Sequence, residues 1–250
     1  MPADHHRVDT TPRHALLTLA ATSLVALASG AVLITTTVCA HAQQPAAVAP
    51  APSVAPPAVT AAAADAGFNA AFARFIAAKP GDDAAIDDAA SQFGKLLAAA
   101  PTDPVLRAYA GAATSMRATT TMLPWKKMGF AEDGLALIDK ALAQLTPAHE
   151  APSHQGVPAV LSVKFTAAST FLSMPAMFNR GERGHKLLDE VLKHPQFEAT
   201  PAGFKTSVWL RAGQQAVADQ QPAQARQWYE KAAASGTPQA AVARSRLQAL

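Results

Sequence analysis

Cysteine is almost absent from this sequence of 250 residues, in which Cys39 is the only example. It lies directly before Ala40-His41-Ala42, which offers small residues at the two positions that a signal peptidase reads. Cleavage after Ala42 would leave a chain without cysteine, and would therefore exclude disulfides, thiol chemistry and cysteine-ligated metals. Acylation at Cys39 is a minor alternative, because Thr36-Thr37-Val38 resembles a lipoprotein cleavage box poorly.

Charge is also absent from a long run near the N-terminus, between residues 15 and 38. Arg7 and Arg13 precede this run and the small-residue site follows it, which is the arrangement of a secretory signal. We therefore expect residues 1–42 to be a signal peptide and the mature protein to be periplasmic or secreted. The run also approaches the ~20 residues that span a bilayer. An inner-membrane anchor formed by residues 15–38 is the alternative.

Concentrated positive charge is lacking in the remainder. Residues 43–250 hold 19 Lys and Arg against 16 Asp and Glu, and the two signs are interspersed. A nucleic-acid partner, which requires a basic stripe, is not expected. The start of this part is built almost entirely from Ala, Pro, Val and Gln, which cannot bury enough apolar surface to fold. We expect a disordered linker over 43–66 and a folded domain over 67–250.

Alternating runs rich in β-branched residues, which would indicate strands, are missing from that domain. Helical spacing is present instead. Phe68, Phe72, Phe75 and Ile76 form one stripe, and Asp82 or Asp83 can cap a second helix that begins before Ile86. Four further helices are expected to begin with proline as their first residue, in three cases behind a capping Asp or Thr: Asp103-Pro104, Thr200-Pro201, Gln221-Pro222 and Thr237-Pro238. The sequence predicts an all-α fold.

Small residues and aromatics recur at fixed offsets along these helices. The C-terminal segment fits the tetratricopeptide pattern best, through Trp209, Ala212, Gly213 and Ala216 in a first helix and Ala225, Tyr229 and Ala232 in a second. Upstream, partial matches are in phase: Ala89, Phe93, Gly111, Gly134 and Ile138. The chain from Ile86 onward resembles a tetratricopeptide-like (TPR-like) protein of an uncharacterised bacterial exported family. The resemblance implies an α-solenoid of antiparallel helix pairs that serves as a scaffold, and it implies no activity.

Two segments interrupt the repeat. LPWKKMGF (123–130) lengthens what we expect to be a connection between two helices, and LSMPAMFNRGER (172–183) is irregular in the next unit. In one interpretation, their apolar side chains pack beneath the loops. The alternative is a partner-binding patch, because Trp and Arg often dominate interface energies. In that hypothesis Trp125 flanks the groove, and Lys126 and Lys127 face an acidic or carboxylate group of a protein or peptide partner. The second segment completes the patch with Phe178, Arg180 and Arg183.

Catalytic and metal-binding motifs are not supported. His149-Glu150-x3-His154 has one residue too many for a zinc helix, and nearby prolines break that helix. His185 and His194 are interpreted as solvent-facing. The methionines are interpreted as gap-fillers between helices rather than as copper ligands. We therefore expect no enzyme, cofactor or metal. The sequence favours an adaptor or assembly factor that binds proteins, with a small-ligand or metal carrier as the alternative and a hydrolytic enzyme as a less favoured one.

Overall fold

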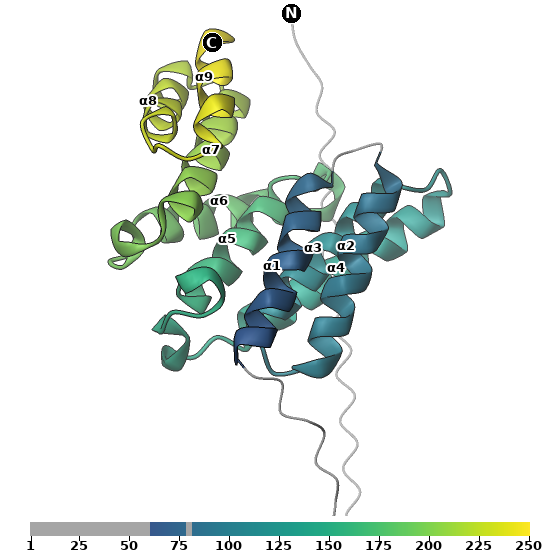
Figure 1. Ribbon diagram of the computed structural model, residues 1–250. Coiled ribbons are helices and arrows are strands. Elements are labelled where there is room, and N and C mark those ends of the chain that lie inside the picture. The colour runs from purple at the N-terminus through teal and green to yellow at the C-terminus, as the bar shows by residue number, and fades with distance from the viewer. Residues whose placement is uncertain (1–60, 79–81) are drawn as a thin grey trace, which may run out of the picture. The chain divides into compact units, whose positions relative to one another are not determined.

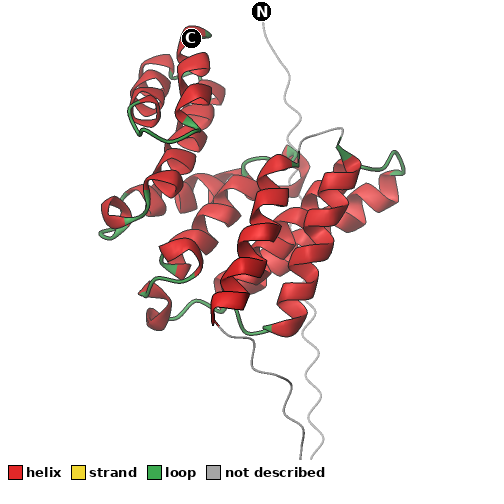
Figure 2. Cartoon of the chain, viewed as in Figure 1, coloured by secondary structure: helices red, strands yellow, loops and turns green. Residues whose placement is uncertain are grey.

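The computed structural model describes residues 61–78 and 82–250, and every regular element in this part is a helix (Figures 1 and 2). The all-α prediction is confirmed there. The signal peptide and most of the expected linker lie outside the described residues. The α-helices are α1 (Ala61–Ala77), α2 (Asp83–Ala99), α3 (Pro104–Met116), α4 (Pro124–Ala143), α5 (Ala159–Phe171), α6 (Gly181–Leu192), α7 (Ala202–Ala218), α8 (Pro222–Ala233) and α9 (Ala240–Gln248). Short 3-10 helices connect several of them: Arg117–Thr119, Pro147–Glu150, His154–Gly156, Ala176–Phe178 and Phe197–Ala199.

The N-terminal helix is longer than the sequence pattern indicated. Helix α1 begins at Ala61, inside the stretch expected to be linker. Alanine has the highest intrinsic helix propensity, so the four alanines at 61–64 extend the helix that the phenylalanine stripe anchors. The boundary expected at residue 66 is therefore wrong, and the alanine-rich end of the linker belongs to the fold.

Helix starts follow the expected capping chemistry at some sites and depart from it at others. Asp103 caps α3, because its Oδ1 accepts hydrogen bonds from the backbone N–H groups of Val105 (2.8 Å) and Leu106 (3.1 Å). Pro222 is the first residue of α8 as expected. Pro201 and Pro238, in contrast, precede the first residues of α7 and α9. Their threonine caps are also absent.

The two threonines are engaged elsewhere. The Thr200 hydroxyl donates to the carbonyl oxygen of Phe197 at 2.7 Å, which closes the preceding 3-10 turn. The Thr237 hydroxyl donates to the Thr206 hydroxyl at 3.3 Å. Thr200 therefore stabilises the turn before it and Thr237 contacts the neighbouring helix α7, and neither caps the helix that follows.

Helices that are consecutive in the chain pack against one another: α1 on α2, α3 on α4, α5 on α6 and α7 on α8. Glycines allow the close approach in two of these pairs. A methyl group at Gly111 of α3 would lie 2.7 Å from the carbonyl oxygen of Gly134 in α4. At Gly213 of α7, a methyl group would lie 2.6 Å from Cδ1 of Tyr229 in α8. Both separations are shorter than van der Waals contact, so these positions accept no side chain.

The buried apolar side chains form clusters that join neighbouring pairs. One cluster unites Phe68 and Ala71 of α1 with Phe93, Tyr109 and Val163. A second lies between α4, α5, α6 and α7. Helix α3 also packs on α5. The link from α5 to α7 is made by aromatic rings, with the centroids of Phe165 and Phe204 5.4 Å apart.

The segment LPWKKMGF is helical, so the expectation that it forms a connection is wrong. Pro124 is the first residue of α4, Leu123 precedes it with extended backbone angles, and the segment through Phe130 makes the first turns of that helix. The physical reason is that proline is well tolerated as the first residue of a helix, where its missing N–H and fixed φ cost nothing. The connection from α3 is instead the 3-10 turn at 117–119 and residues 120–123.

Candidate functional site

A cavity of about 1250 Å³ lies among the described helices. Its walls come mainly from alternate helices of the chain, α1, α3, α5 and α7. The first turns of α4, the segment after α5 and the segment before α9 complete it. The second helices α2, α6 and α8 contribute no lining residue, whereas α4, the second helix of its pair, contributes through its first turns.

Aromatic rings form the wall that α1 and α3 provide. Phe68, Phe72 and Phe75 surround the ring of Tyr109 with centroid distances of 5.5, 5.6 and 5.4 Å, all edge to face. Phe93 of α2 stacks on Tyr109 from behind at 5.2 Å. Burial raises the pKa of the Tyr109 phenol, which hydrogen bonds to Thr166 and Ser162 partly offset. Tyr109 is therefore a neutral, fixed surface at physiological pH.

Hydroxyl groups form a stripe along the facing side of α5. The stripe consists of Ser162, Thr166, Ser169, Thr170 and Ser173, which recur at helical spacing and all line the cavity. Several of these hydroxyls donate within the chain. Thr170 donates to the carbonyl oxygen of Thr166 at 2.9 Å, and Ser173 donates to that of Ser169 at 2.8 Å. On α7, Ser207 donates to the carbonyl oxygen of Gly203 at 3.0 Å. The wall is therefore mildly polar. Thr170, Ser173 and Ser207 are paired, whereas the buried hydroxyls of Ser115 and Ser169 have no hydrogen-bond partner among the described residues.

Carboxylates are missing from the described residues that line the cavity. Lys127, in the first turns of α4, is its only lysine or arginine. Acidic residues are also missing from the first turn of α4. A helix N-terminus carries a partial positive charge, so this end of the cavity is electropositive.

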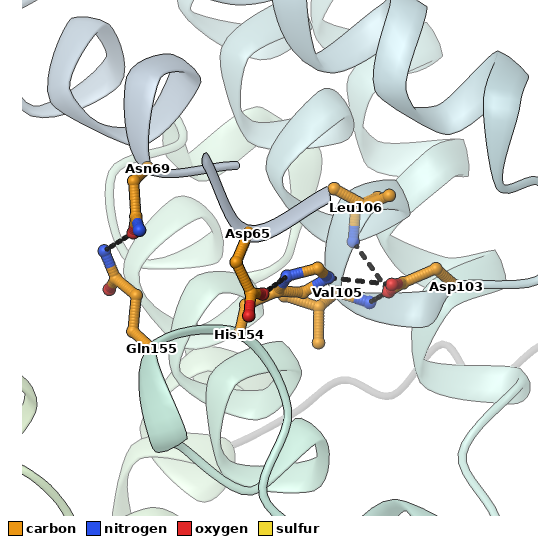
Figure 3. A network of polar contacts seen from close by, with 7 residues as sticks. All are labelled: Asp65, Asn69, Asp103, Val105, Leu106, His154 and Gln155. Atoms are coloured by element: carbon orange, nitrogen blue, oxygen red, sulfur yellow. Dashed lines mark hydrogen bonds and ion pairs between the residues drawn. The ribbon is translucent and has the colours of Figure 1, made fainter. Parts of the chain in front are cut away.

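His154 joins α1 to the start of α3 at the opposite end of the wall (Figure 3). Its ring stacks on Phe68 with the centroids 4.3 Å apart. Nε2 donates to Oδ2 of Asp103 at 2.8 Å, since a carboxylate can only accept. Nδ1 lies 3.4 Å from Oδ1 of Asp65 in α1. Beside it, the Gln155 amide donates to Asn69 of α1 at 3.0 Å.

The two carboxylates shift the ionisation of this histidine. Burial lowers the pKa of His154, but the hydrogen bonds and attraction from Asp103 and Asp65 outweigh burial and raise it overall. Burial likewise raises the pKa of Asp103, and the bonds from His154 and from the backbone of α3 outweigh it, so that pKa is lowered. Protonated His154 consequently bridges a carboxylate on each side and holds α1 against the wall.

The six residues of the expected binding patch divide between two places. Lys127 and Phe178 line the cavity. Trp125 is 69% exposed and Lys126 is exposed beside it. Arg180 and Arg183 instead bind Asp139 of α4, Arg180 at 2.8 Å and Arg183 at 2.5 Å.

Both arginines also lie over the Phe171 ring, each at 5.3 Å from its centroid. They neutralise a carboxylate of the chain itself and clamp the irregular segment to α4. The structure therefore gives them an internal partner and leaves Lys126 and Lys127 as the cations of the patch.

Most of the cavity lining was missed from the sequence. The α1 stripe was identified as helical but not as a wall, and the hydroxyls of α5 at Ser162, Thr166 and Ser169 were not singled out. Their helical spacing was an available signal. Which helix faces the cavity depends on packing, and an amphipathic pattern does not distinguish a buried face from a cavity wall.

The remaining histidines have local roles. Nδ1 of His149 accepts a hydrogen bond from the Thr146 backbone at 2.9 Å. His194 is only 15% exposed and lies 3.3 Å from Glu150, so its expected solvent-facing position is wrong. His185 is 45% exposed. Across residues 61–78 and 82–250, no three His, Cys, Asp or Glu residues gather where they could hold a metal ion.

The chain matches no known protein family, no curated protein and no solved structure at a significant level. In the described part of the chain, no helix combines the length and apolar content needed to cross a membrane.

Proposed function

We propose that this chain is an exported scaffold of tetratricopeptide-like helix pairs that holds a segment of a protein partner, as an adaptor or assembly factor of the bacterial periplasm. The observation that carries the proposal is the cavity lined by α1, α3, α5 and α7. Stacked helix pairs of a solenoid present their first helices on one concave face, and such faces bind partners. The glycine contacts of α3 with α4 and of α7 with α8 support the same architecture.

The size of the cavity favours a polypeptide over a small ligand. Small-molecule pockets occupy roughly 300–1,000 Å³, and this cavity measures about 1250 Å³. A helix about 10 Å in diameter that rises 1.5 Å per residue fills about 120 Å³ per residue. The cavity therefore matches about ten residues of helix, or roughly three turns. A periplasmic carrier of an apolar small ligand is the second candidate, because aromatic rings make up one wall.

Site-specific photo-crosslinking in intact cells tests the proposal. A photoreactive phenylalanine analogue at Met177, which is 71% exposed and lines the cavity, should yield adducts whose added mass is that of a protein. The same analogue at Val242, which is 48% exposed on α9 and outside the cavity, is the matched control. Adducts of small mass at Met177 would establish the carrier instead. Equal yields at both positions would refute a specific site.

A further inference from the structure

Methionine is concentrated at the cavity. Of the five methionines in the described part of the chain, Met116, Met128, Met174 and Met177 line it, and only Met122 does not. They belong to separate elements: the last residue of α3, the first turns of α4, and the segment that follows α5. The ends of these elements therefore form a methionine-lined end of the cavity, completed by Phe178 and Lys127.

Gap-filling does not explain this distribution. The fully buried apolar side chains of the fold are Ala, Val, Leu, Ile, Phe and Tyr, with no methionine among those described. A methionine used only to fill core gaps would be buried, whereas Met177 is 71% exposed and the other three are half-buried, although Met174 also packs against the cluster between α4, α5, α6 and α7. Methionine has three flexible torsions and a polarizable sulfur, so a surface built from it adapts to ligands of different shape.

The hydrogen bonding of the polar groups in the walls favours a bound partner segment that is helical over one that is extended. The hydroxyls of Thr170, Ser173 and Ser207 already donate to their own helices, and the Gln239 amide donates to Ser207 at 3.1 Å. The buried hydroxyls of Ser115 and Ser169 have no partner among the described residues, but two hydroxyls cannot pair the backbone of a whole extended segment. The other backbone groups of such a segment would be buried against these walls without partners, which is destabilising. A helix pairs its own backbone groups and needs only apolar contact.

Charge determines the polar face of that helix. The described lining contains no carboxylate and includes Lys127 at the methionine-lined end. Lys126 is exposed beside it, and the N-terminus of α4 adds positive potential. A neutral or acidic polar face is complementary to this end, and a basic one is repelled.

We propose that the methionine-lined end binds the apolar faces of amphipathic helices of differing sequence, in partner proteins whose polar face is neutral or acidic. This inference rests on the proposed scaffold function. It adds the class of partner, an amphipathic helix, and the expectation that apolar faces of different sequence are all bound. The chain thereby serves several partners rather than one, because the same side chains rearrange for each apolar face.

Binding of synthetic helices to the mature chain tests the inference. Three labelled peptides of about four turns carry stripes of Leu, Ile or Phe at i, i+3, i+4 and i+7 on the same Ala, Gln and Glu background. Fluorescence anisotropy should give dissociation constants that agree within about tenfold among the three. A peptide with the Leu composition shuffled, which has no stripe, should bind at least about tenfold more weakly.

Replacing methionine by a stiffer side chain tests whether methionine flexibility is the reason that different apolar faces are bound with similar affinity. Ile has similar volume but a restricted χ1, so Met128→Ile with Met177→Ile should widen the spread among the three peptides beyond tenfold. Met122→Ile, outside the cavity, should leave the spread unchanged. Circular dichroism checks that each variant is folded. If the double variant misfolds, the single Met177→Ile variant, at an exposed position, is measured in its place.

The outcomes separate the two proposals. A spread above tenfold with the unsubstituted chain, or no widening in the isoleucine variants, overturns the adaptable methionine surface while leaving the scaffold intact. Equal binding of the shuffled peptide, or of a Leu peptide interrupted by proline, overturns the helical occupant. Failure of all peptides together with absence of protein adducts at Met177 removes the scaffold function itself.

Discussion

Single residues determine how closely the helices of a pair approach. Gly134 is the clearest case, because a methyl group there would lie 2.5 Å from the Gly111 carbonyl oxygen and 2.7 Å from the Ser115 backbone nitrogen. Both obstacles belong to the backbone of α3, which no rotamer change can move. The repeat pattern singled out Gly111 and Gly134 from the sequence, and the structure shows that each faces the other.

We predict that Gly134→Ala destabilises the chain by about 1–3 kcal/mol, since overpacking a tight helix contact costs that much. Urea unfolding followed by circular dichroism measures the change. Gly129→Ala in the same helix is the control, because no atom lies within 4 Å of a methyl group there. It should stabilise α4 by about 0.5–1 kcal/mol through helix propensity. Equal effects of the two substitutions would show that the pair does not pack as described.

Charged residues were harder to assign than glycines. Arg180 and Arg183 were expected to face a partner, but Asp139 of α4 binds both. Their sequence separation from Asp139 is about forty positions, so no local spacing predicts the contact. The three side chains meet only because the chain folds so that the start of α6 lies against α4.

At the scale of elements, α1 is the helix whose docking depends most on one ionisable side chain. His154 contacts Asp65 of α1 and stacks on Phe68, while it donates to Asp103 at the start of α3. In the neutral form one imidazole nitrogen lacks a proton and its lone pair faces a carboxylate. The protonated form donates a hydrogen bond to Asp103 through Nε2 and forms an ion pair with Asp65 through Nδ1, so the attachment of α1 is strongest when His154 is charged.

The pH dependence follows from the two shifted groups. The pKa of His154 is raised above 6.5, so its contribution to stability is fully present below about pH 6.5 and is lost as pH rises through the folded pKa. The pKa of Asp103 is lowered below 3.8, so its contribution is present above about pH 3.8 and is lost as pH falls through the folded pKa. The joint contribution of His154 and Asp103 to the free energy of unfolding is therefore greatest between about pH 3.8 and pH 6.5.

We predict that His154→Phe, which keeps the ring stack but removes both charge contacts, lowers the free energy of unfolding by about 1.5–3 kcal/mol at pH 5.5, the range for hydrogen bonds to charged groups. At pH 9 the difference between the variant and the unsubstituted chain should shrink. Urea unfolding at both pH values measures it. His185→Phe, at a histidine that is 45% exposed, is the control. A difference independent of pH would refute the clamp.

The start of α4 shows why an element was misassigned. Pro124 carries the same signal as Pro104 and Pro222, each the first residue of its helix. The spacing of the repeat suggested a long connection and outweighed that local signal. Trp, Lys and Met are compatible with a helix, so nothing in the segment itself required a loop.

At the scale of the whole chain, the arrangement depends on contacts between consecutive pairs. Phe165 and Phe204 connect α5 to α7, and Phe197 lies 6.2 Å from Trp209 on the same side. The cavity extends over the first of these contacts, because Phe165 and Phe204 both line it. The proposed binding surface therefore depends on the contact between Phe165 and Phe204.

We predict that the protein recovered from the periplasmic fraction begins at Gln43, since the small residues of Ala40-His41-Ala42 suit a signal peptidase. Intact mass measurement of the purified chain determines this. Alkylation of thiols should label no residue of the mature form, because Cys39 is removed. A full-length mass in the membrane fraction would establish the anchor at residues 15–38 instead.

The helical class, the capping of α3, the small residues at pair contacts and the lack of a strand pattern could all be predicted from local sequence. These depend on local propensity and on periodicity along one helix, which are properties of neighbouring residues. Tertiary packing was needed to show that alternate helices line a cavity, that four methionines gather at one end of it, and that Asp139 binds the two arginines. Such features join residues distant in the chain, and a pattern along one helix carries no information about which other helix its face will meet.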